Sequence, residues 1–411
     1  MKSILYNTAT LKISEVHDYS GKPRSFSMIP DGYSVWHVPG SLSDSVLRHH
    51  NLVVVKNGLP VSTTNIMESV SKIRTIDDST AINLPNKQPE PGQKKILVAR
   101  FKGLGDILMS WFGLEELRKK YKDYHITYLT SPDSALLFCG QQTLVDRVIY
   151  TEYEHPASGE PDLPDNFDAR NYDLVINMIN RVDFGDIVYK KPRADNFADL
   201  MKVSIDTNNS IRHIKVYNNE LTYMKKVIKY NPSYRYVICQ LSSNGRPRVW
   251  PLEHYITLGR LLDKKHIRVI FTSSNPLHRG IRTTDSIINM SCRTSIREYI
   301  ALISLCDVAV CPDSSMMHIA AHLPDIKVVS MWGSTSSWAH ATYYKNVHAI
   351  EAKASCCPCW DWQLDSCDND GRDRLVCMRR ITPKMVMSSV MECFSSNWIP
   401  RGSHMGVAYN V

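Results

Sequence analysis

The chain has 411 residues, of which 43% are hydrophobic and 22% charged, a balance typical of a globular protein with two or three domains. No uncharged apolar run approaches the roughly 18 residues of a membrane span, and the N-terminus has no apolar signal-peptide core, so we expect a cytoplasmic protein. The formal net charge of +8 favours an anionic partner, such as a nucleotide sugar, a phosphorylated glycan, a membrane surface or nucleic acid.

Residues 1–92 form the first predicted block, a small extra domain with strand patterns and no catalytic motif. Tyr33–Val38 alternates like a strand, and residues 52–55 followed by Lys56-Asn57-Gly58 indicate a strand that enters a hairpin turn. The polar tract at residues 83–94 is predicted to be a linker.

Two further blocks, residues 93–231 and 232–395, each alternate strands with helices. Strands are predicted at 96–99, 125–129, 145–150, 172–177, 236–241, 267–272, 308–310 and 327–331. Helices are predicted at 107–120, 251–264, 295–305 and 314–323. This alternation predicts an α/β fold with two Rossmann-like, doubly wound domains that face a cleft. The tail at 396–411 contains Pro-Arg-Gly-Ser-His-Met, which resembles a vector-derived protease site, and we exclude it from function.

A glycine turn, Gly103-Leu104-Gly105, joins the first strand of the second block to its helix and is followed by one acid, Asp106. A carboxylate at this place lies at the carboxyl edge of a parallel sheet, where open α/β folds bind ligands. The local pattern leaves two interpretations of Asp106 open, a functional carboxylate and a simple helix cap.

The loop at residues 242–251 follows a strand, is rich in serine and contains Gly245, Arg246 and Arg248. Exposed backbone N–H groups and two guanidinium groups suit a diphosphate. The alternative interpretation is a solvated basic loop.

Two other strand ends have a similar character. Asp313, Ser314 and Ser315 begin a helix whose free N–H groups would hold a phosphate, and His318 lies one turn further in. The alternative for His318 is an ordinary core histidine. Residues 333–335, Gly333-Ser334-Thr335, form another loop that follows a strand and contains glycine and hydroxyl groups.

Five of the eleven cysteines crowd between residues 356 and 377. Four of them, Cys357, Cys359, Cys367 and Cys377, suit a tetrahedral zinc site, although the spacing lacks a C-x2-C pair. Zinc, reduced structural thiols and disulfides stay open as alternatives.

Together these motifs resemble those of the heptosyltransferase family of inverting glycosyltransferases, glycosyltransferase family 9, over residues 94–394. The Gly-Leu-Gly-Asp turn is similar to the family's N-terminal motif, and Arg248-Val249-Trp250-Pro251 stands where the family has a basic residue before Trp-Pro. Residues 313–318 resemble its donor-phosphate motif and residues 333–335 its Gly-x-Thr loop. The resemblance implies a GT-B fold, with the nucleotide diphosphate on the C-terminal domain and the acceptor on the N-terminal one.

The resemblance also implies transfer of a sugar from a nucleotide-diphosphate donor, most plausibly ADP-heptose, to a hydroxyl of a bacterial surface glycan such as lipopolysaccharide core. Asp106 would be the catalytic base, no cofactor would take part in catalysis, and the protein could contact the inner membrane peripherally. The implied donor-binding residues are Gly105, Arg246, Arg248, Asp313, Ser314, Ser315, His318, Gly333, Ser334 and Thr335. The alternatives are a transferase of the same fold that modifies a DNA base hydroxyl, and a non-catalytic binding module.

Overall fold

The computed structural model divides the chain into two units, Met1–Asp78 and Ser79–Val411. In the first unit it describes five strands; in the second it describes residues 84–151, 163–164, 167–179, 181–182, 190–208, 211–360 and 375–395. Within these residues no helix is long and apolar enough to cross a membrane. Cys367 and the tail at 396–411 lie outside the described residues.

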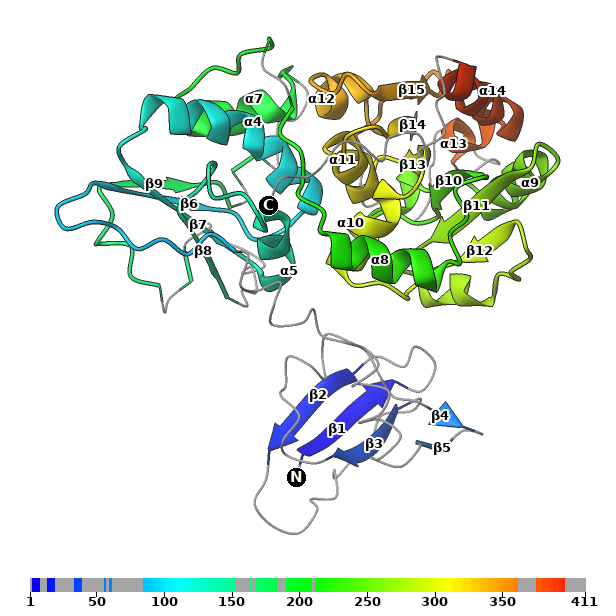
Figure 1. The fold of residues 1–411 in the computed structure, drawn as a ribbon, viewed down its shortest axis with the longest axis horizontal. Coiled ribbons are helices and arrows are strands. Elements are labelled where there is room, and N and C mark those ends of the chain that lie inside the picture. The colour runs from blue at the N-terminus through cyan, green and yellow to red at the C-terminus, as the bar shows by residue number, and fades with distance from the viewer. Residues whose placement is uncertain are drawn as a thin grey trace. The chain divides into compact units, whose positions relative to one another are not determined.

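The first unit contains a three-stranded antiparallel sheet of order β2-β1-β3 and a separate hairpin (Figure 1). The sheet consists of β1 (Lys2–Asn7), β2 (Ile13–Asp18) and β3 (Tyr33–Val38). The hairpin pairs β4 (Val55–Lys56) with β5 (Leu59–Pro60), which confirms the hairpin predicted here. Residues 52–54 of the predicted strand lie outside the described residues.

The second unit begins with a four-stranded parallel sheet of order β8-β7-β6-β9. Its strands are β6 (Lys95–Ala99), β7 (His125–Thr130), β8 (Arg147–Tyr150) and β9 (Leu174–Asn177). The chain leaves β6 for α4 (Leu104–Lys120), which packs beside α7 (Arg193–Leu200) (Figure 1). The strand order reverses between β6 and β9, so the end of β6 is a topological switch point.

The tract predicted as a linker, residues 83–94, instead joins the edge of this sheet. The carbonyl oxygen of Pro85 accepts from the backbone N–H of Val148, and Lys87 donates its N–H to the carbonyl oxygen of Asp146. Asn86 forms an isolated antiparallel bridge with Arg147. The linker prediction was wrong for residues 85–87, because backbone groups of a polar tract can pair with the edge of a sheet as well as those of an apolar one.

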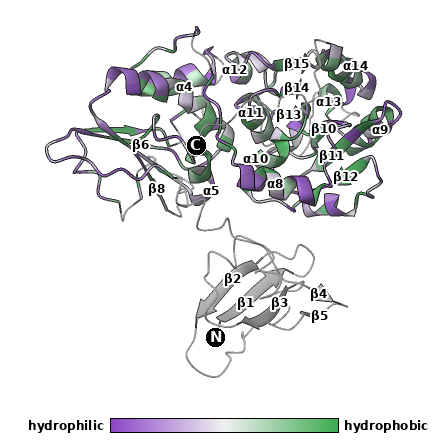
Figure 2. Cartoon of the chain, in the orientation of Figure 1, coloured by the Kyte–Doolittle hydropathy of each residue, from purple (hydrophilic) through white to green (hydrophobic). Residues whose placement is uncertain are grey.

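A six-stranded parallel sheet follows, in the order β12-β11-β10-β13-β14-β15. Its strands are β10 (Arg235–Gln240), β11 (Ile267–Thr272), β12 (Ile287–Asn289), β13 (Val308–Pro312), β14 (Lys327–Trp332) and β15 (Val347–Glu351). This is the order of a doubly wound nucleotide-binding fold, with its switch point between β10 and β13. Figure 2 shows hydrophobic residues along the central strands, as expected for strands buried on both faces.

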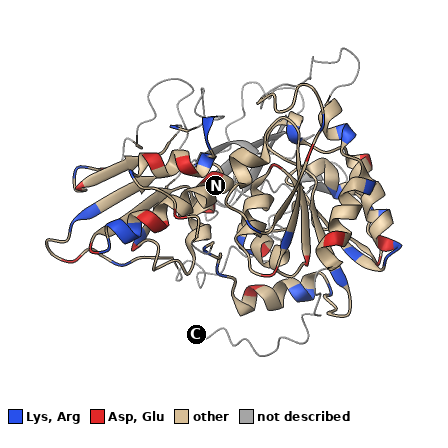
Figure 3. Ribbon diagram, turned by 90° about the horizontal axis from the view of Figure 1, so that it is seen from above, with Lys and Arg blue, Asp and Glu red and all other residues tan. Residues whose placement is uncertain are grey.

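Helices cover both faces of this sheet, and most of the charged residues lie on helices and loops rather than on the central strands (Figure 3). They are α8 (Asn218–Val227), α9 (Leu252–Asp263), α10 (Ile296–Ser304), α11 (Ser315–Ala321), α12 (Ser337–Ala341), α13 (Val376–Arg380) and α14 (Pro383–Ser395). Ser295 and Glu298 form the predicted capping box of α10. One hydrophobic core runs through both halves, and it includes Leu108 and Trp111 of α4 with Met316 and Ile319 of α11.

Candidate active site

The two switch points of the second unit face each other where α4 begins. Gly105 in the first turn of α4 lies directly against His318 of α11: a Cβ added to Gly105 would be 2.5 Å from Cδ2 and 2.9 Å from Nε2 of the imidazole. Only glycine permits this approach without a shift of the ring. The carboxyl edge of the first sheet therefore meets that of the second.

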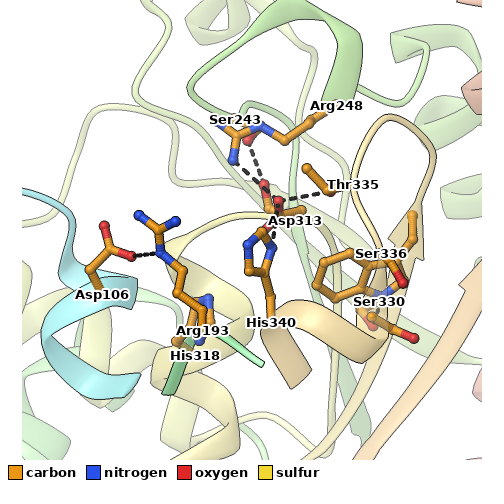
Figure 4. A network of polar contacts seen from close by, with 12 residues as sticks. Asp106, Arg193, Ser243, Arg248, Asp313, His318, Ser330, Thr335, Ser336 and His340 are labelled. Carbon is orange, nitrogen blue, oxygen red and sulfur yellow. Dashed lines mark hydrogen bonds and ion pairs between the residues drawn. The ribbon is translucent and has the colours of Figure 1, made fainter. Parts of the chain in front are cut away.

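Two arginines hold the carboxylate of Asp106. Arg193 Nε is 2.6 Å from Oδ1 (Figure 4), and Arg100 Nη2 is 2.8 Å from Oδ2. The N-cap of α4 is Gly103, and no side chain makes a capping hydrogen bond there. The capping interpretation of Asp106 was therefore wrong, and its local role is to neutralise two guanidinium groups.

The electrostatics of this cluster keep Asp106 ionised. Burial by itself would raise the pKa of Asp106, but the charges of Arg193 and Arg100 outweigh it and hold the pKa well below its usual range. Both arginines are anchored in turn, since Arg193 Nη1 donates to the carbonyl oxygen of Val182 and Arg100 Nη1 to that of Met178. The carboxylate is thus fixed in position as well as in charge.

At the second sheet, another acid, Asp313, is the centre of a polar cluster at the ends of β10, β13 and β14 (Figure 4). Its Oδ2 accepts from Thr335 Oγ1 at 2.9 Å and from Arg248 Nη1 at 3.3 Å, and it lies 3.4 Å from His340 Nδ1. Ser243 Oγ donates to the backbone carbonyl of Asp313 at 2.6 Å. Three loops that the sequence placed at strand ends are therefore brought together.

This cluster changes the interpretation of two predicted residues. Arg248 does not belong to a solvated loop, because its side chain is only 13% exposed and is paired with Asp313. Burial would raise the pKa of Asp313, but the neighbouring His340 and Arg248 hold it far below its usual range. Asp313 therefore orients the groups around it, and its negative charge is already neutralised. The side chain of Arg246 lies outside the described residues.

The other predicted residues line the same edge. Ser314 is the N-cap of α11, and Ser315 is the first residue of the helix. The hydroxyl of Ser334 is buried and has no hydrogen-bond partner among the described residues, so it is available to an anion. A Cβ on Gly333 would lie 2.7 Å from Met378 Sδ and 2.9 Å from Cys377 Sγ, which makes glycine necessary there as well.

His318 is buried, as a core histidine would be, but it lies at the meeting point of the two edges. Burial lowers its pKa to about 3, so the imidazole is neutral at physiological pH. It can accept or donate a hydrogen bond there without adding charge.

The cysteine-rich segment lies beside this edge. An interaction between the two thiols, in which Cys357 hydrogen-bonds to Cys377, lowers the pKa of Cys377 to about 7. Cys359 is exposed, and within the described part of the segment no three potential ligands are grouped as a metal site. The backbone N–H of Trp360 donates to the carbonyl oxygen of Ser334 at 2.7 Å, which ties the segment to the loop at 333–335.

Four residues of the site were not predicted from the sequence: Arg100, Arg193, Ser243 and His340. Arg100 directly follows the strand predicted at 96–99, and Ser243 lies inside the predicted donor-binding loop at residues 242–251. These two positions offered a signal. Arg193 and His340 offered none, because each reaches the site only through the packing of its helix.

Comparison with known proteins gives one family and several related folds. Residues 196–365 match the model of glycosyltransferase family 9 (heptosyltransferase). No protein of curated function matches the chain. ADP-heptose lipopolysaccharide heptosyltransferase II of Escherichia coli is 15% identical with a TM-score of 0.54, covering 73% of this chain and 98% of its own. A family 9 glycosyltransferase from Veillonella parvula is 14% identical with a TM-score of 0.57, covering 74% and 99%.

A third solved structure extends over more of the chain. The iron-containing dodecameric heptosyltransferase TibC of enterotoxigenic E. coli, solved with ADP-D-β-D-heptose, is 12% identical with a TM-score of 0.52. It covers 96% of this chain and 90% of its own. At these identities the likeness shows the fold, and that fold is GT-B, as the sequence resemblance implied. Arg248, Asp313 and Thr335 fall inside the matched family domain, whereas Asp106, Arg100 and Arg193 precede it.

Proposed function

Residues 196–365 of this chain match the model of glycosyltransferase family 9, and on that premise we propose that the protein is an inverting, metal-independent glycosyltransferase that uses ADP-heptose. The observation that carries the proposal is the meeting of two switch points at Gly105 and His318. One edge holds an ionised carboxylate, Asp106, and the other holds Arg248 and the hydroxyl of Ser334.

The chemistry follows from that division. An acceptor hydroxyl on the Asp106 side attacks the anomeric carbon of the donor sugar while the bond from that carbon to the diphosphate oxygen breaks. The hydroxyl proton passes to the Asp106 carboxylate, and the nucleotide diphosphate leaves with the bonding electron pair. Attack from the face opposite the leaving group inverts the anomeric configuration.

The donor side would stabilise the leaving group. Arg248 offers a charged donor, and the start of α11 at Ser314 and Ser315 offers backbone N–H groups to phosphate oxygens. Thr335 and Asp313 fix the direction of Arg248, so the site would need little rearrangement when charge develops on the diphosphate. His318 and Gly333 complete the wall of the donor site.

The acceptor we propose is a bacterial surface glycan such as lipopolysaccharide core, reached from the cytoplasm with peripheral contact to the inner membrane. The likeness to heptosyltransferase II supports this class of acceptor.

The cysteine-rich segment is proposed to hold one structural metal ion on Cys357, Cys359, Cys367 and Cys377. The interaction of Cys357 with Cys377 supports the idea, since the two would be neighbouring ligands. Zinc fits four thiolates, and the iron named for TibC makes iron the competing metal. The ion would stiffen the loop at 333–335 and take no part in the chemistry.

A ligand-stabilisation screen tests the proposed function. ADP-heptose should raise the unfolding temperature of the full chain in a concentration-dependent way, and ADP should do so less strongly. UDP-glucose and GDP-mannose serve as controls, because they differ from ADP-heptose in the nucleobase as well as in the sugar. Stabilisation by UDP-glucose together with transfer to hydroxymethylated DNA would favour the nucleic-acid alternative. Stabilisation without any transfer would favour a binding module.

A further inference from the structure

A chain of hydrogen bonds leads away from His318 into the interior of the second unit. His318 Nδ1 is 2.9 Å from Tyr344 Oη, Tyr344 Oη is 3.4 Å from His322 Nε2, and His322 Nδ1 is 2.7 Å from the carbonyl oxygen of Arg212. All three side chains in the chain are at least nine-tenths buried. We call His318, Tyr344 and His322 the relay.

The Arg212 carbonyl gives the relay a consistent direction. A carbonyl oxygen only accepts; with Nδ1 of His322 donating to it, Nε2 of the neutral ring accepts from the Tyr344 hydroxyl. The oxygen of Tyr344 then accepts from Nδ1–H of His318. Burial lowers the pKa of His318 to about 3 and that of His322 to about 4, so both rings are neutral. His318 is left with an unprotonated Nε2.

The far end of the relay is held on both sides. Beyond the bond from its ring to the Arg212 carbonyl, the backbone oxygen of His322 accepts from the N–H of Ile214 at 2.8 Å. The ring of Trp111 meets the His322 ring edge-on, with the ring centroids 5.5 Å apart. The orientation of His322 is therefore determined by backbone and packing, and the relay transmits it to His318.

The near end of the relay opens onto the candidate active site. The edge of the His318 ring that carries Cδ2 and Nε2 faces Gly105, the residue before Asp106, and Figure 4 shows His318 and Asp106 in the same cluster. Nε2 can accept a hydrogen bond there, beside the Asp106 carboxylate that is already paired with two arginines. A substrate hydroxyl that contacts both groups would have its direction fixed.

We propose that Tyr344 and His322 are positioning residues that hold His318 in its Nδ1–H tautomer, so that Nε2 accepts a hydrogen bond from a hydroxyl of the sugar substrate beside Asp106. The tautomer follows from the relay alone. The hydroxyl as its partner rests on the proposed function.

The test of the relay is ¹⁵N NMR of the full chain labelled at histidine, with His318→Gln to identify the His318 signals. The wild type should show His318 with a protonated Nδ1 and an unprotonated Nε2. Tyr344→Phe removes the acceptor of that proton and should shift His318 toward the Nε2–H form. The matched control is Tyr343→Phe, which removes the neighbouring hydroxyl that donates to Asp195 and should leave the His318 signals unchanged.

An Nε2–H tautomer in the wild type would overturn the relay even if the Tyr344 variant did not fold. An unchanged His318 signal in folded Tyr344→Phe would overturn it as well. Single-turnover transfer then tests the hydroxyl contact: the variant should lose about 3- to 10-fold in rate, as expected for one lost hydrogen bond. A shifted tautomer with wild-type transfer would overturn the contact and leave the transferase assignment intact. Absence of transfer in the wild type would instead refute the proposed function and the contact, while the spectrum still decides the relay.

Discussion

Arg193 Nε lies 2.6 Å from Oδ1 of Asp106, although 87 residues separate the two in the sequence. Asp106 lies in the first turn of α4, the helix that follows β6, and Arg193 begins α7, so the pair joins the starts of two helices at the carboxyl edge of the first sheet. This ion pair determines both the charge and the direction of the proposed catalytic base.

Arg193→Gln should move the acid limb of the kcat/KM profile to higher pH. The pKa of Asp106 is depressed in the folded protein, so the wild-type base stays ionised below the usual carboxyl pKa of about 3.9. Removing one of the two cations raises that pKa, so activity is lost at a higher pH as the solution is acidified. Arg118→Gln, which breaks the ion pair with Asp146 in the same half, is the control and should leave the limb in place.

Arg248→Ala should weaken the binding of the nucleotide diphosphate, measured by calorimetry. A charge-assisted contact is worth about 1.5–3 kcal/mol, which corresponds to roughly 10- to 150-fold in Kd. Because Arg248 also pairs with Asp313, we expect a lower unfolding temperature too, unlike the result for an exposed arginine. Arg379→Ala, at a half-exposed arginine paired with Glu253, should change neither quantity measurably. Unaltered ADP affinity in the Arg248 variant would show that the loop does not bind the donor.

Thr335→Val keeps the shape of the side chain and removes the hydroxyl that donates to Asp313. A hydrogen bond to a buried carboxylate contributes about 1.5–3 kcal/mol, so the free energy of unfolding should fall by about that amount in urea titrations. Thr257→Val, whose hydroxyl donates to a backbone carbonyl on the exposed face of α9, should change it by less than about 0.5 kcal/mol. Equal effects of the two variants would argue against a central role for Asp313.

The purified chain should contain one metal ion per molecule, measured by elemental analysis after preparation without chelators. The same analysis identifies zinc or iron. Cys377→Ser should abolish stoichiometric metal, because it removes a proposed ligand, whereas Cys393→Ser, a buried cysteine outside the segment, should keep it. A metal-free wild type would leave the cysteines as reduced structural thiols or disulfides.

The sequence predicted local features well and long-range pairings poorly. The strand at 96–99 and the capping box at Ser295 depend on neighbouring residues, and the structure contains both. The helix after the strand is also present, but it begins at Leu104 rather than at Ile107, so Gly105 belongs to its first turn and not to the predicted turn. The partners of Asp106 depend on where α7 packs, which no local pattern reveals. The tract at 85–87 was misread for the same reason, since its partner strand β8 lies some 60 residues away.

The structure also changes what a substitution at Asp106 would do to stability. If Asp106 were only a helix cap, asparagine would replace it without loss of stability. Asp106 instead neutralises the charges of Arg100 and Arg193, whose side chains are each 5% exposed. We therefore expect Asp106→Asn to destabilise the fold by roughly 3 kcal/mol or more, as for other broken buried ion pairs. Asp146→Asn is the matched variant, because Asp146 is equally exposed at 18% and is paired with Arg118. Urea titrations of both variants should give comparable losses.

The most direct test of the account is single-turnover transfer by Asp106→Asn, with the donor identified by the stabilisation screen and a lipopolysaccharide-core acceptor, at a temperature where every variant is folded. The rate should fall about 10²- to 10⁴-fold, because an amide cannot accept the hydroxyl proton, while donor affinity stays within twofold. Asp146→Asn should transfer at nearly the wild-type rate despite its lower stability. Wild-type transfer by Asp106→Asn would contradict the account and leave Asp106 as a structural partner of Arg100 and Arg193.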